Sequence, residues 1–293
     1  MAKFESFYLK HYKKFFIIPV VIVFLAIGVI LVNYIKTGEI VGKDVSLKGG
    51  LTLTFYTGKE IGDLESSLAK NFEGDFKVKR LAEFGTGKQI GIIIEATDVK
   101  ENELKKFLEE KFETKLTEKN YSVEFIGSTL GKAFYSQMKI AIILAFVFMA
   151  IVVFITYKTP VPSFAVVFAA LSDIICTIAI LDLSKIKLST AGIAALLLLI
   201  GYSVDTDILL TTRIIKRKGE ERLFERLVAS AKTGLTMTFT TLAVAIVGLL
   251  VSASLVLKEI FLIIAIGLSV DIIMTYFMNA GLLIWYARRK NVY

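Results

Sequence analysis

Six long apolar segments limit what this chain can fold into more than any other feature of its sequence. A bilayer core about 30 Å thick needs roughly 20 apolar residues of helix, because backbone polar groups can pair there only within a helix or a closed barrel. Buried helices of soluble proteins usually have shorter apolar runs. We therefore predict a polytopic α-helical membrane protein with six transmembrane helices. The predicted spans are residues 15–34, 140–157, 161–181, 189–212, 235–257 and 260–285.

The overall composition narrows the classes of function. Of the 293 residues, 55% are hydrophobic and the mean hydropathy is +0.67, far above the range of soluble enzymes. One cysteine, Cys176, excludes an intramolecular disulfide, and one histidine, His11, excludes histidine-clustered metal sites and histidine-dependent triads. We expect no enzymatic activity, no metal and no cofactor, and any proton chemistry has to use carboxylates.

Lysine and arginine residues predict the orientation in the membrane. Short cytoplasmic loops are enriched in these residues, and one side of the predicted bundle carries most of those near helix ends. That side holds Lys3, Lys10, Lys13, Lys14, Lys158, Arg213, Lys216, Arg217, Lys218, Arg222, Arg226, Lys232, Arg288, Arg289 and Lys290. The short loops on the other side hold only Lys185, Lys187 and Lys258. We expect a multi-pass protein of the cell membrane with residues 1–14, 213–234 and 286–293 in the cytoplasm.

Membrane topology also explains the formal net charge of +8. On a soluble protein this excess would indicate nucleic acid or a membrane surface as partner, whereas here we expect membrane lipid and no nucleic acid. The cytoplasmic basic loop, residues 213–234, is predicted to form a short amphipathic helix with Leu223, Leu227 and Ala231 on one side. A specific contact of this loop with anionic lipid or the ribosome is a less favoured alternative.

Residues 35–139, between the first two spans, have the composition of a water-soluble domain and lie outside the cell in this topology. The pattern predicts strands at residues 45–55, 76–84, 89–95 and 121–125, helices at 60–72 and 102–116, and a turn at 85–87. This order is that of a ferredoxin-like (βαββαβ) α+β domain, with a four-stranded sheet and both helices on one face. It lacks a phosphate-cradling glycine loop, a nucleophile elbow and metal-ligand spacing, so we interpret it as a binding or lever module. Residues 129–138 form a connector that could transmit movement to the second span.

Four aspartates within the predicted spans are the main candidates for function. A charged aspartate near the centre of a membrane helix costs roughly 2.5 to 3.5 kcal/mol on insertion scales, and ionisable groups there are usually functional. Asp173 and Asp271 lie near the middle of their spans, whereas Asp205 and Asp207 lie about 7 to 10 Å closer to the cytoplasm. We predict that these residues relay protons or another cation. The alternative is that all four are protonated or hydrogen-bonded and only hold helices together.

Asp205 and Asp207 are expected to have different partners. Two residues along a helix correspond to a rotation of about 200°, so the two carboxylates cannot face the same groove. Ser203 and Thr211 extend a polar stripe through Asp207. Gly201 lies with Asp205 on the other side of the helix.

Three further polar residues accompany the aspartates. Thr206 lies between the two acids of the fourth span. Arg213, at the cytoplasmic end of this span, can neutralise a carboxylate or reach the lipid headgroups. Asn279 is expected to form an interhelical hydrogen bond.

These residues and their layout resemble the SecD/SecF family of protein-export membrane proteins, which is related to the resistance-nodulation-division transporters. The resemblance is carried by the domain entry Leu47-Lys48-Gly49-Gly50-Leu51 and by the run Gly201-Tyr202-Ser203-Val204-Asp205-Thr206-Asp207 followed by Arg213. Six spans with one large loop after the first complete it, and a loop of this size is similar to the smaller, SecF type. Bacterial members have Asn-Asp-Thr where this chain has Asp205, Thr206 and Asp207, a departure that resembles the archaeal branch.

The resemblance implies a subunit that pairs with a SecD-like membrane subunit and associates with the SecY translocon. Such a subunit uses the transmembrane ion gradient to assist translocation and release of exported polypeptides. We expect an aspartate of the fourth span to bind and release a proton or another small cation, with Asp207 as first choice and Asp205 as second. One alternative is half of a resistance-nodulation-division-type transporter of small molecules or lipids. Another is a passive scaffold that holds the translocon in shape without using the gradient.

Overall fold

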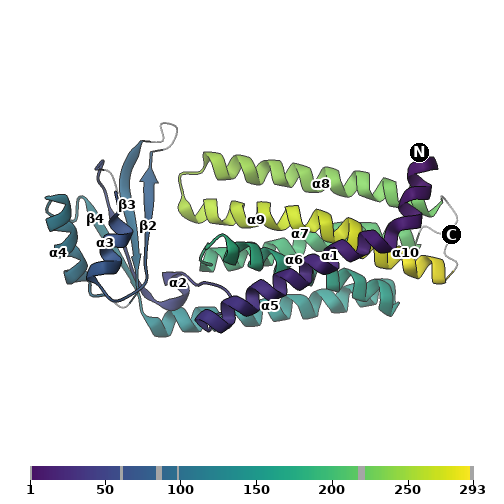
Figure 1. Ribbon diagram of the computed structural model, residues 1–293, viewed down its shortest axis with the longest axis horizontal. Coiled ribbons are helices and arrows are strands. Elements are labelled where there is room, and N and C mark those ends of the chain that lie inside the picture. Colours follow the sequence, from purple (N-terminus) through teal and green to yellow (C-terminus); the bar gives the residue numbers. More distant parts are fainter. Residues whose placement is uncertain (1, 60–61, 84–87, 98, 217–221, 291–293) are drawn as a thin grey trace.

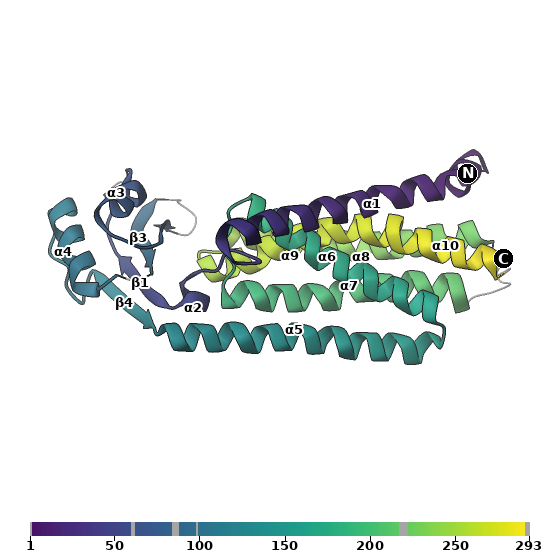
Figure 2. The same ribbon diagram turned by 60° about the horizontal axis from the view of Figure 1, so that its bottom comes forward.

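Long helices form a bundle, and a small α+β domain is attached to one end of it (Figure 1). The computed structural model describes residues 2–59, 62–83, 88–97, 99–216 and 222–290. The start of α1 and the end of α10 lie at the end of the bundle away from the α+β domain, as Figures 1 and 2 show. The bundle comprises α1 (Ala2–Thr37), α5 (Ser128–Tyr157), α6 (Pro160–Leu183), α7 (Thr190–Lys216), α8 (Leu223–Val251), α9 (Leu255–Ile273), the π-helical segment η1 (Met274–Asn279) and α10 (Ala280–Arg289).

In the described part of the chain, these elements form six helical stretches that are long and apolar enough to cross a membrane, which confirms the predicted architecture. They are Lys10–Thr37, Ser128–Tyr157, Pro160–Leu183, Thr190–Lys216, Leu223–Val251 and Leu255–Arg289. The third, fourth and sixth stretches hold most of the buried residues, whereas α1, α5 and α8 surround them as largely exposed apolar helices. These outer helices leave apolar surface for lipid or for a partner protein.

Residues 213–234 do not form the predicted loop with a short amphipathic helix. α7 continues to Lys216 and α8 begins at Leu223, while residues 217–221 lie outside the described part of the chain. Leu223 and Leu227 are buried together with side chains of α7 and α10, so the apolar face packs into the bundle instead of lying on a surface. The Glu225 carboxylate accepts a hydrogen bond from the N–H of Arg222 (3.2 Å), which satisfies a donor at the start of α8.

The fifth predicted span, residues 235–257, also ends earlier than expected. α8 stops at Val251 and α9 starts at Leu255. The hydroxyl of Ser254 accepts a hydrogen bond from the N–H of Leu257 (3.4 Å) and caps α9. Because serine side chains favour caps over helix interiors, the helix breaks here although the sequence on both sides is apolar.

The α+β domain has the predicted ferredoxin-like order of elements. They are α2 (Val45–Lys48), β1 (Gly50–Phe55), α3 (Leu64–Asn71), β2 (Phe76–Ala82), β3 (Gln89–Ala96), α4 (Glu101–Phe112) and β4 (Tyr121–Ile126). The strands form one sheet in the order β2-β3-β1-β4, and every neighbouring pair is antiparallel. Leu53 of β1, Ile92 and Ile94 of β3, Leu68 of α3 and Leu104 of α4 are completely buried in one core, because both helices cover the same face of the sheet.

Parts of this domain differ from the sequence-based expectation. The strand expected to start at Val45 starts at Gly50, because Asp44 caps a helical turn, α2, directly before it. The second helix ends at Phe112 rather than residue 116, since Glu113 adopts a left-handed conformation with φ 47°. The predicted turn at residues 85–87 and the predicted start of the first helix at residue 60 lie outside the described residues.

The predicted connector, residues 129–138, is the first part of α5. Only Gly127 separates β4 from this helix, so the last strand leads directly into a membrane span (Figure 2). Phe134 and Met138 pack on the main apolar core of the bundle. The α+β domain is therefore joined to the bundle through a continuous helix on one side and through the segment around α2 on the other.

Because of the carboxyl group of Asp44, we expect the stability of the folded chain to depend on pH. Burial, followed by repulsion from Glu95 and Glu259, raises the pKa of Asp44 to about 6 from the usual 3.8. Because the folded-state pKa exceeds the unfolded one, this group favours folding at low pH, and that contribution is lost as the pH rises from about 4 to about 6. Asp44→Asn keeps an oxygen acceptor and removes the charge. Above pH 6 we expect this variant to have the higher melting temperature, with a free energy of unfolding about 3 kcal/mol larger than that of the parent chain; near pH 4 we expect the two melting temperatures to match.

The measurement is thermal unfolding of the purified chains across this pH range. Asp63→Asn is a suitable control, because Asp63 is exposed and its side chain makes no capping hydrogen bond. A lower melting temperature of Asp44→Asn above pH 6 would contradict the assignment.

Candidate functional site

Three of the four predicted aspartates meet inside the bundle. Asp173 comes from α6, Asp207 from α7 and Asp271 from α9, and each has 0% of its surface exposed. Among the described residues, none of the ion pairs involves any of these three side chains. An isolated ionised carboxylate is very costly in such surroundings, so the group as a whole has to retain protons.

A single hydroxyl bridges two of these carboxyls. Thr275 Oγ1 lies 2.9 Å from Asp207 Oδ1 and 3.1 Å from Asp271 Oδ1. A threonine hydroxyl has only one proton to donate, so it can serve as donor to one carboxylate at a time. The other contact becomes a hydrogen bond when that carboxyl is itself protonated and donates to the threonine oxygen.

The carboxyls of Asp173 and Asp271 also lie close enough to each other to interact. Two ionised carboxylates at this separation would repel each other strongly, whereas one shared proton turns the contact into a hydrogen bond. The Ser203 hydroxyl donates to Asp173 Oδ2 (2.5 Å), and the Thr206 hydroxyl lies 3.3 Å from Asp271 Oδ2. The three acids and their hydroxyl partners thus form one continuous hydrogen-bonded cluster across α6, α7 and α9.

The π-helical segment η1 supplies two of the partners. Thr275 and Asn279 both lie in it, and Asn279 Nδ2 donates to the same oxygen of Asp207, at 2.7 Å. The interhelical hydrogen bond expected of Asn279 is present. Thr275 was not among the predicted site residues, although Asp271, Thr275 and Asn279 are spaced four residues apart, a polar stripe that the sequence displays. Single π-helical turns within α-helices frequently occur at functional sites.

Asp205 is not part of this cluster. Its side chain is exposed on the bundle surface, whereas Asp207, two residues later, is completely buried. The two carboxyls lie on opposite faces of α7, as the rotation of about 200° predicts. Gly201 and Tyr202 are also exposed. These two residues and Asp205 are thus the exposed members of the run from Gly201 to Asp207.

The two remaining predicted residues, Thr211 and Arg213, lie in different surroundings. Thr211 is completely buried on the same stripe as Asp207. Arg213 donates to Thr233 Oγ1 on α8 (3.1 Å). Four buried oxygen atoms in and beside the cluster have no hydrogen-bond partner within the described part of the chain: Asp173 Oδ1, Asp207 Oδ2, Thr211 Oγ1 and Asn279 Oδ1. The cluster can therefore accept additional protons or donors without breaking existing bonds.

In the described ranges, no group of three or more His, Cys, Asp or Glu side chains is arranged to hold a metal ion.

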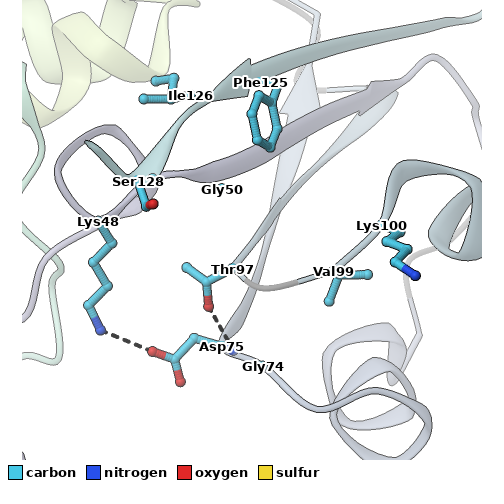
Figure 3. A pocket seen from close by; sticks show the side chains of 11 residues that line it. Lys48, Gly50, Gly74, Asp75, Thr97, Val99, Lys100, Phe125, Ile126 and Ser128 are labelled. Atoms are coloured by element: carbon cyan, nitrogen blue, oxygen red, sulfur yellow. Dashed lines mark hydrogen bonds and ion pairs between the residues drawn. The ribbon is translucent and has the colours of Figure 1, made fainter. Parts of the chain in front are cut away.

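Gly49 and Gly50, the glycine pair of the domain entry, lie far along the chain from the aspartates. Their φ angles are +89° and +143°, a region that favours glycine. They line a groove of about 640 Å³ between the α+β domain and the start of α5 (Figure 3). In this groove Lys48 reaches Asp75 (3.1 Å), and the hydroxyl of Thr97 accepts from the N–H of Asp75 (3.1 Å). The glycine pair thus belongs to the junction between the two parts of the molecule.

The sequence matches known proteins over nearly its whole length. Residues 106–289 match the family described as protein export membrane protein SecD/SecF, C-terminal. The protein-export membrane protein SecF of Pyrococcus furiosus is 37% identical over 281 residues, covering 95% of this chain and 92% of the relative. That of Methanocaldococcus jannaschii is also 37% identical, over 286 residues, covering 95% of this chain and 96% of the relative.

A solved structure shares the fold. The crystal structure of SecDF, a translocon-associated membrane protein from Thermus thermophilus, superimposes with a TM-score of 0.73 at 17% identity. The match covers 96% of this chain and 38% of the SecDF chain. Six membrane helices, a ferredoxin-like domain after the first and this likeness to named relatives lead to one conclusion: the chain is a multi-pass membrane protein that belongs to the SecF family of protein-export membrane proteins.

Proposed function

We propose that this chain assists protein export by coupling it to the transmembrane ion gradient, and that the cluster of Asp173, Asp207 and Asp271 is where protons bind. The observation that carries the proposal is the hydroxyl of Thr275 between two buried carboxyls. Such an arrangement has two alternative hydrogen-bond patterns that differ by the position of a proton. Names of the relatives denote export proteins, which favours this function over a transporter of small molecules or lipids.

The two patterns connect different helices. When Asp207 is ionised, Thr275 and Asn279 both donate to it and tie η1 to α7. When Asp207 is protonated, Thr275 is free to donate to Asp271, which lies on its own helix, four residues earlier. Protonation therefore weakens the link between α7 and η1, and loss of the proton restores it. Hydrogen bonds to charged groups contribute about 1.5 to 3 kcal/mol each, so the preferred packing of these helices depends on the proton.

The available energy matches this change. One elementary charge moved through about 100 mV yields about 2.3 kcal/mol. This is of the same size as one charge-assisted hydrogen bond. A single proton per cycle is therefore sufficient to move α7 relative to η1.

The face of α7 around Asp205 supports pairing with a SecD-like subunit. A charged side chain exposed to lipid within a membrane helix costs free energy, up to roughly 2.5 to 3.5 kcal/mol at the helix centre. Covering this face with another membrane protein removes that cost, and the exposed Gly201 beside it allows a close approach, since no atom lies within 4 Å of an added Cβ there. In this proposal the SecY translocon, the exported polypeptide and membrane lipid are the remaining partners.

The proposed orientation follows the basic residues. Arg288 and Arg289 lie in the last turn of α10, at the end of the bundle away from the α+β domain (Figure 1), which we place in the cytoplasm. The α+β domain then lies outside, where it meets the exported polypeptide as it leaves the translocon. In this orientation the domain can act as the lever that draws the polypeptide outward.

The test is export by a reconstituted translocon with and without this chain and its SecD-like partner, each with the gradient intact or dissipated. We expect the chain to accelerate export only when the gradient is present. A protonophore and a sodium ionophore, applied separately, identify the coupling ion. An equal contribution with and without the gradient would favour a passive scaffold. A deletion strain with defective small-molecule efflux and normal export would favour the transporter.

A further inference from the structure

The segment between α1 and the α+β domain is held against the first residues of α7. Leu188 N–H donates to Gly42 O (2.7 Å), and Asp44 N–H donates to Leu188 O (3.0 Å), as in a short parallel bridge. Ser189 and Thr190, the next residues of the chain, are bound by side chains from two other elements. Each of residues 188–190, which lie directly before and at the start of α7, therefore forms a hydrogen bond to another part of the molecule.

The hydroxyl of Ser46 makes the contact to Thr190. Thr190 is the first residue of α7, and its N–H has no acceptor within its own helix. It donates to Ser46 Oγ (3.0 Å), and the Ser46 hydroxyl in turn donates to Asp44 Oδ1 (2.5 Å). A residue of the short helix α2 thus caps a membrane helix that lies 144 positions later in the chain.

Toward the C-terminus, no loop separates Ser46 and its helix α2 from the first strand of the α+β domain. α2 ends at Lys48, and β1 starts at Gly50. Leu47, 1% exposed, is buried in the apolar core of the bundle. The backbone of residues 47–49 packs so closely on α5 that a Cβ at Gly131 would lie 2.7 Å from Gly49 N. A displacement of α2 therefore reaches the sheet through β1.

The same α7 carries the proton-binding cluster. Asp207 lies 17 residues after Thr190, about 25 Å along one uninterrupted helix. Another hydrogen bond holds the residue directly before α7: Ser189 N–H donates to Glu259 Oε1 (3.0 Å). Glu259 belongs to α9, the helix that also carries Asp271. Relative movement of α7 and α9 at the cluster consequently changes the position of Thr190 next to Ser46.

We propose that Ser46 is the positioning residue through which movement of α7 reaches the α+β domain. This inference rests on the proposed function, because it requires α7 to move when the cluster binds a proton. Ser46 itself binds neither proton nor substrate. It accepts the hydrogen bond that connects the first residue of α7 to the α+β domain. A hydroxyl at this position is required for movement of α7 to reach the domain.

The experiment measures the movement and the proton binding separately. Spin labels are placed on Glu110→Cys in α4 and Ala253→Cys between α8 and α9, both exposed, while the native Cys176 is buried. The labelled chain, assembled with its partner in lipid nanodiscs, is compared at pH 5 and pH 8 by the label-to-label distance. Infrared difference spectra of the same samples, after subtraction of those recorded with Asp207→Asn, report protonation of the carboxyl cluster, because the contribution of Asp44 cancels in the subtraction.

Three variants test the role of the hydroxyl. Ser46→Ala removes it, Ser46→Thr keeps it, and Thr190→Pro removes the N–H that donates to it. Proline is favoured at the first position of a helix, so Thr190→Pro leaves α7 able to form. Ser252→Ala is the matched control, since Ser252 lies at the same end of the bundle and its hydroxyl bonds only within its own turn, to Ser254 O.

We expect the distance shift to be lost in Ser46→Ala and Thr190→Pro and kept in Ser46→Thr and Ser252→Ala, with an unchanged infrared signal in all four. Asp207→Asn identifies the part of the shift that comes from the cluster, because Asp44 titrates in the same pH range. A shift retained in both Ser46→Ala and Thr190→Pro overturns the inference while the proposed function stands. Absence of the infrared signal in the parent chain overturns the proposed function instead.

Discussion

Replacing Asp207 with asparagine is expected to abolish the stimulation of export by the gradient while leaving the assembled complex intact. Asparagine has nearly the same shape and keeps an oxygen that accepts from Thr275 and Asn279, but it cannot bind and release a proton. One charge moved through about 100 mV corresponds to about 2.3 kcal/mol, which limits the stimulation that can be lost to about 50-fold. The measurement is the ratio of export rates with and without the gradient.

Asp205→Asn is the matched control. The two residues are of the same type and lie two positions apart, yet Asp205 is exposed on the opposite face of α7. We expect Asp205→Asn to retain gradient stimulation and to weaken pairing with the partner subunit at most. If both variants, correctly inserted beside the partner, export normally, ion coupling through α7 is wrong. If only Asp205→Asn loses stimulation, the proton site lies at the partner-facing side.

Gly49→Val is expected to produce the largest structural effect. Gly49 has a φ of +89°, and a Cβ there would overlap the backbone of Ser128 at the start of α5. Backbone strain of this kind costs about 1 to 3 kcal/mol, and the overlap adds to it, so we expect a loss of about 3 kcal/mol or more. The α+β domain then loses its fixed position on the bundle. Thermal unfolding and limited proteolysis of the α2 region measure the change.

Gly58→Ala provides the comparison for Gly49→Val. No atom lies within 4 Å of a Cβ at Gly58, and it lies in the same domain. We expect its melting temperature to stay close to that of the parent chain. Equal stability of the parent and Gly49→Val would show that the junction tolerates a side chain and that the close packing at Ser128 is not required.

The fold was largely predictable because its signals are local. Apolar length identified the six spans, and alternation of apolar residues identified the order of strands and helices around Leu53 and Ile92. The errors occurred where tertiary contacts override local pattern. Leu223 and Leu227 give the pattern of a surface helix, but they pack into the bundle and extend α8. Asp44 converts the start of an apparent strand into a capped helical turn.

The sequence was sufficient to predict which acids are candidates for the site, but not how the helices bring them together. Helical rotation alone separated Asp205 from Asp207, since that relation lies within one helix. The meeting of Asp173 with Asp271 depends on how α6 packs against α9, which no periodicity encodes. The role of Thr275 depends on the π-helical turn that places it beside Asp207, and an apolar sequence gives no local signal for such a turn.

The length of α5 determines how high the α+β domain stands above the membrane. Its 30 residues span about 45 Å, whereas a bilayer core is about 30 Å thick. About 15 Å of helix, close to three turns, therefore extends past the hydrocarbon when the helix is upright, and tilting shortens this excess. The first turns of α5 serve as a rigid stalk. In the proposed orientation we expect the sheet to lie in water beyond the headgroups, with room for a polypeptide to pass between the domain and the lipid surface.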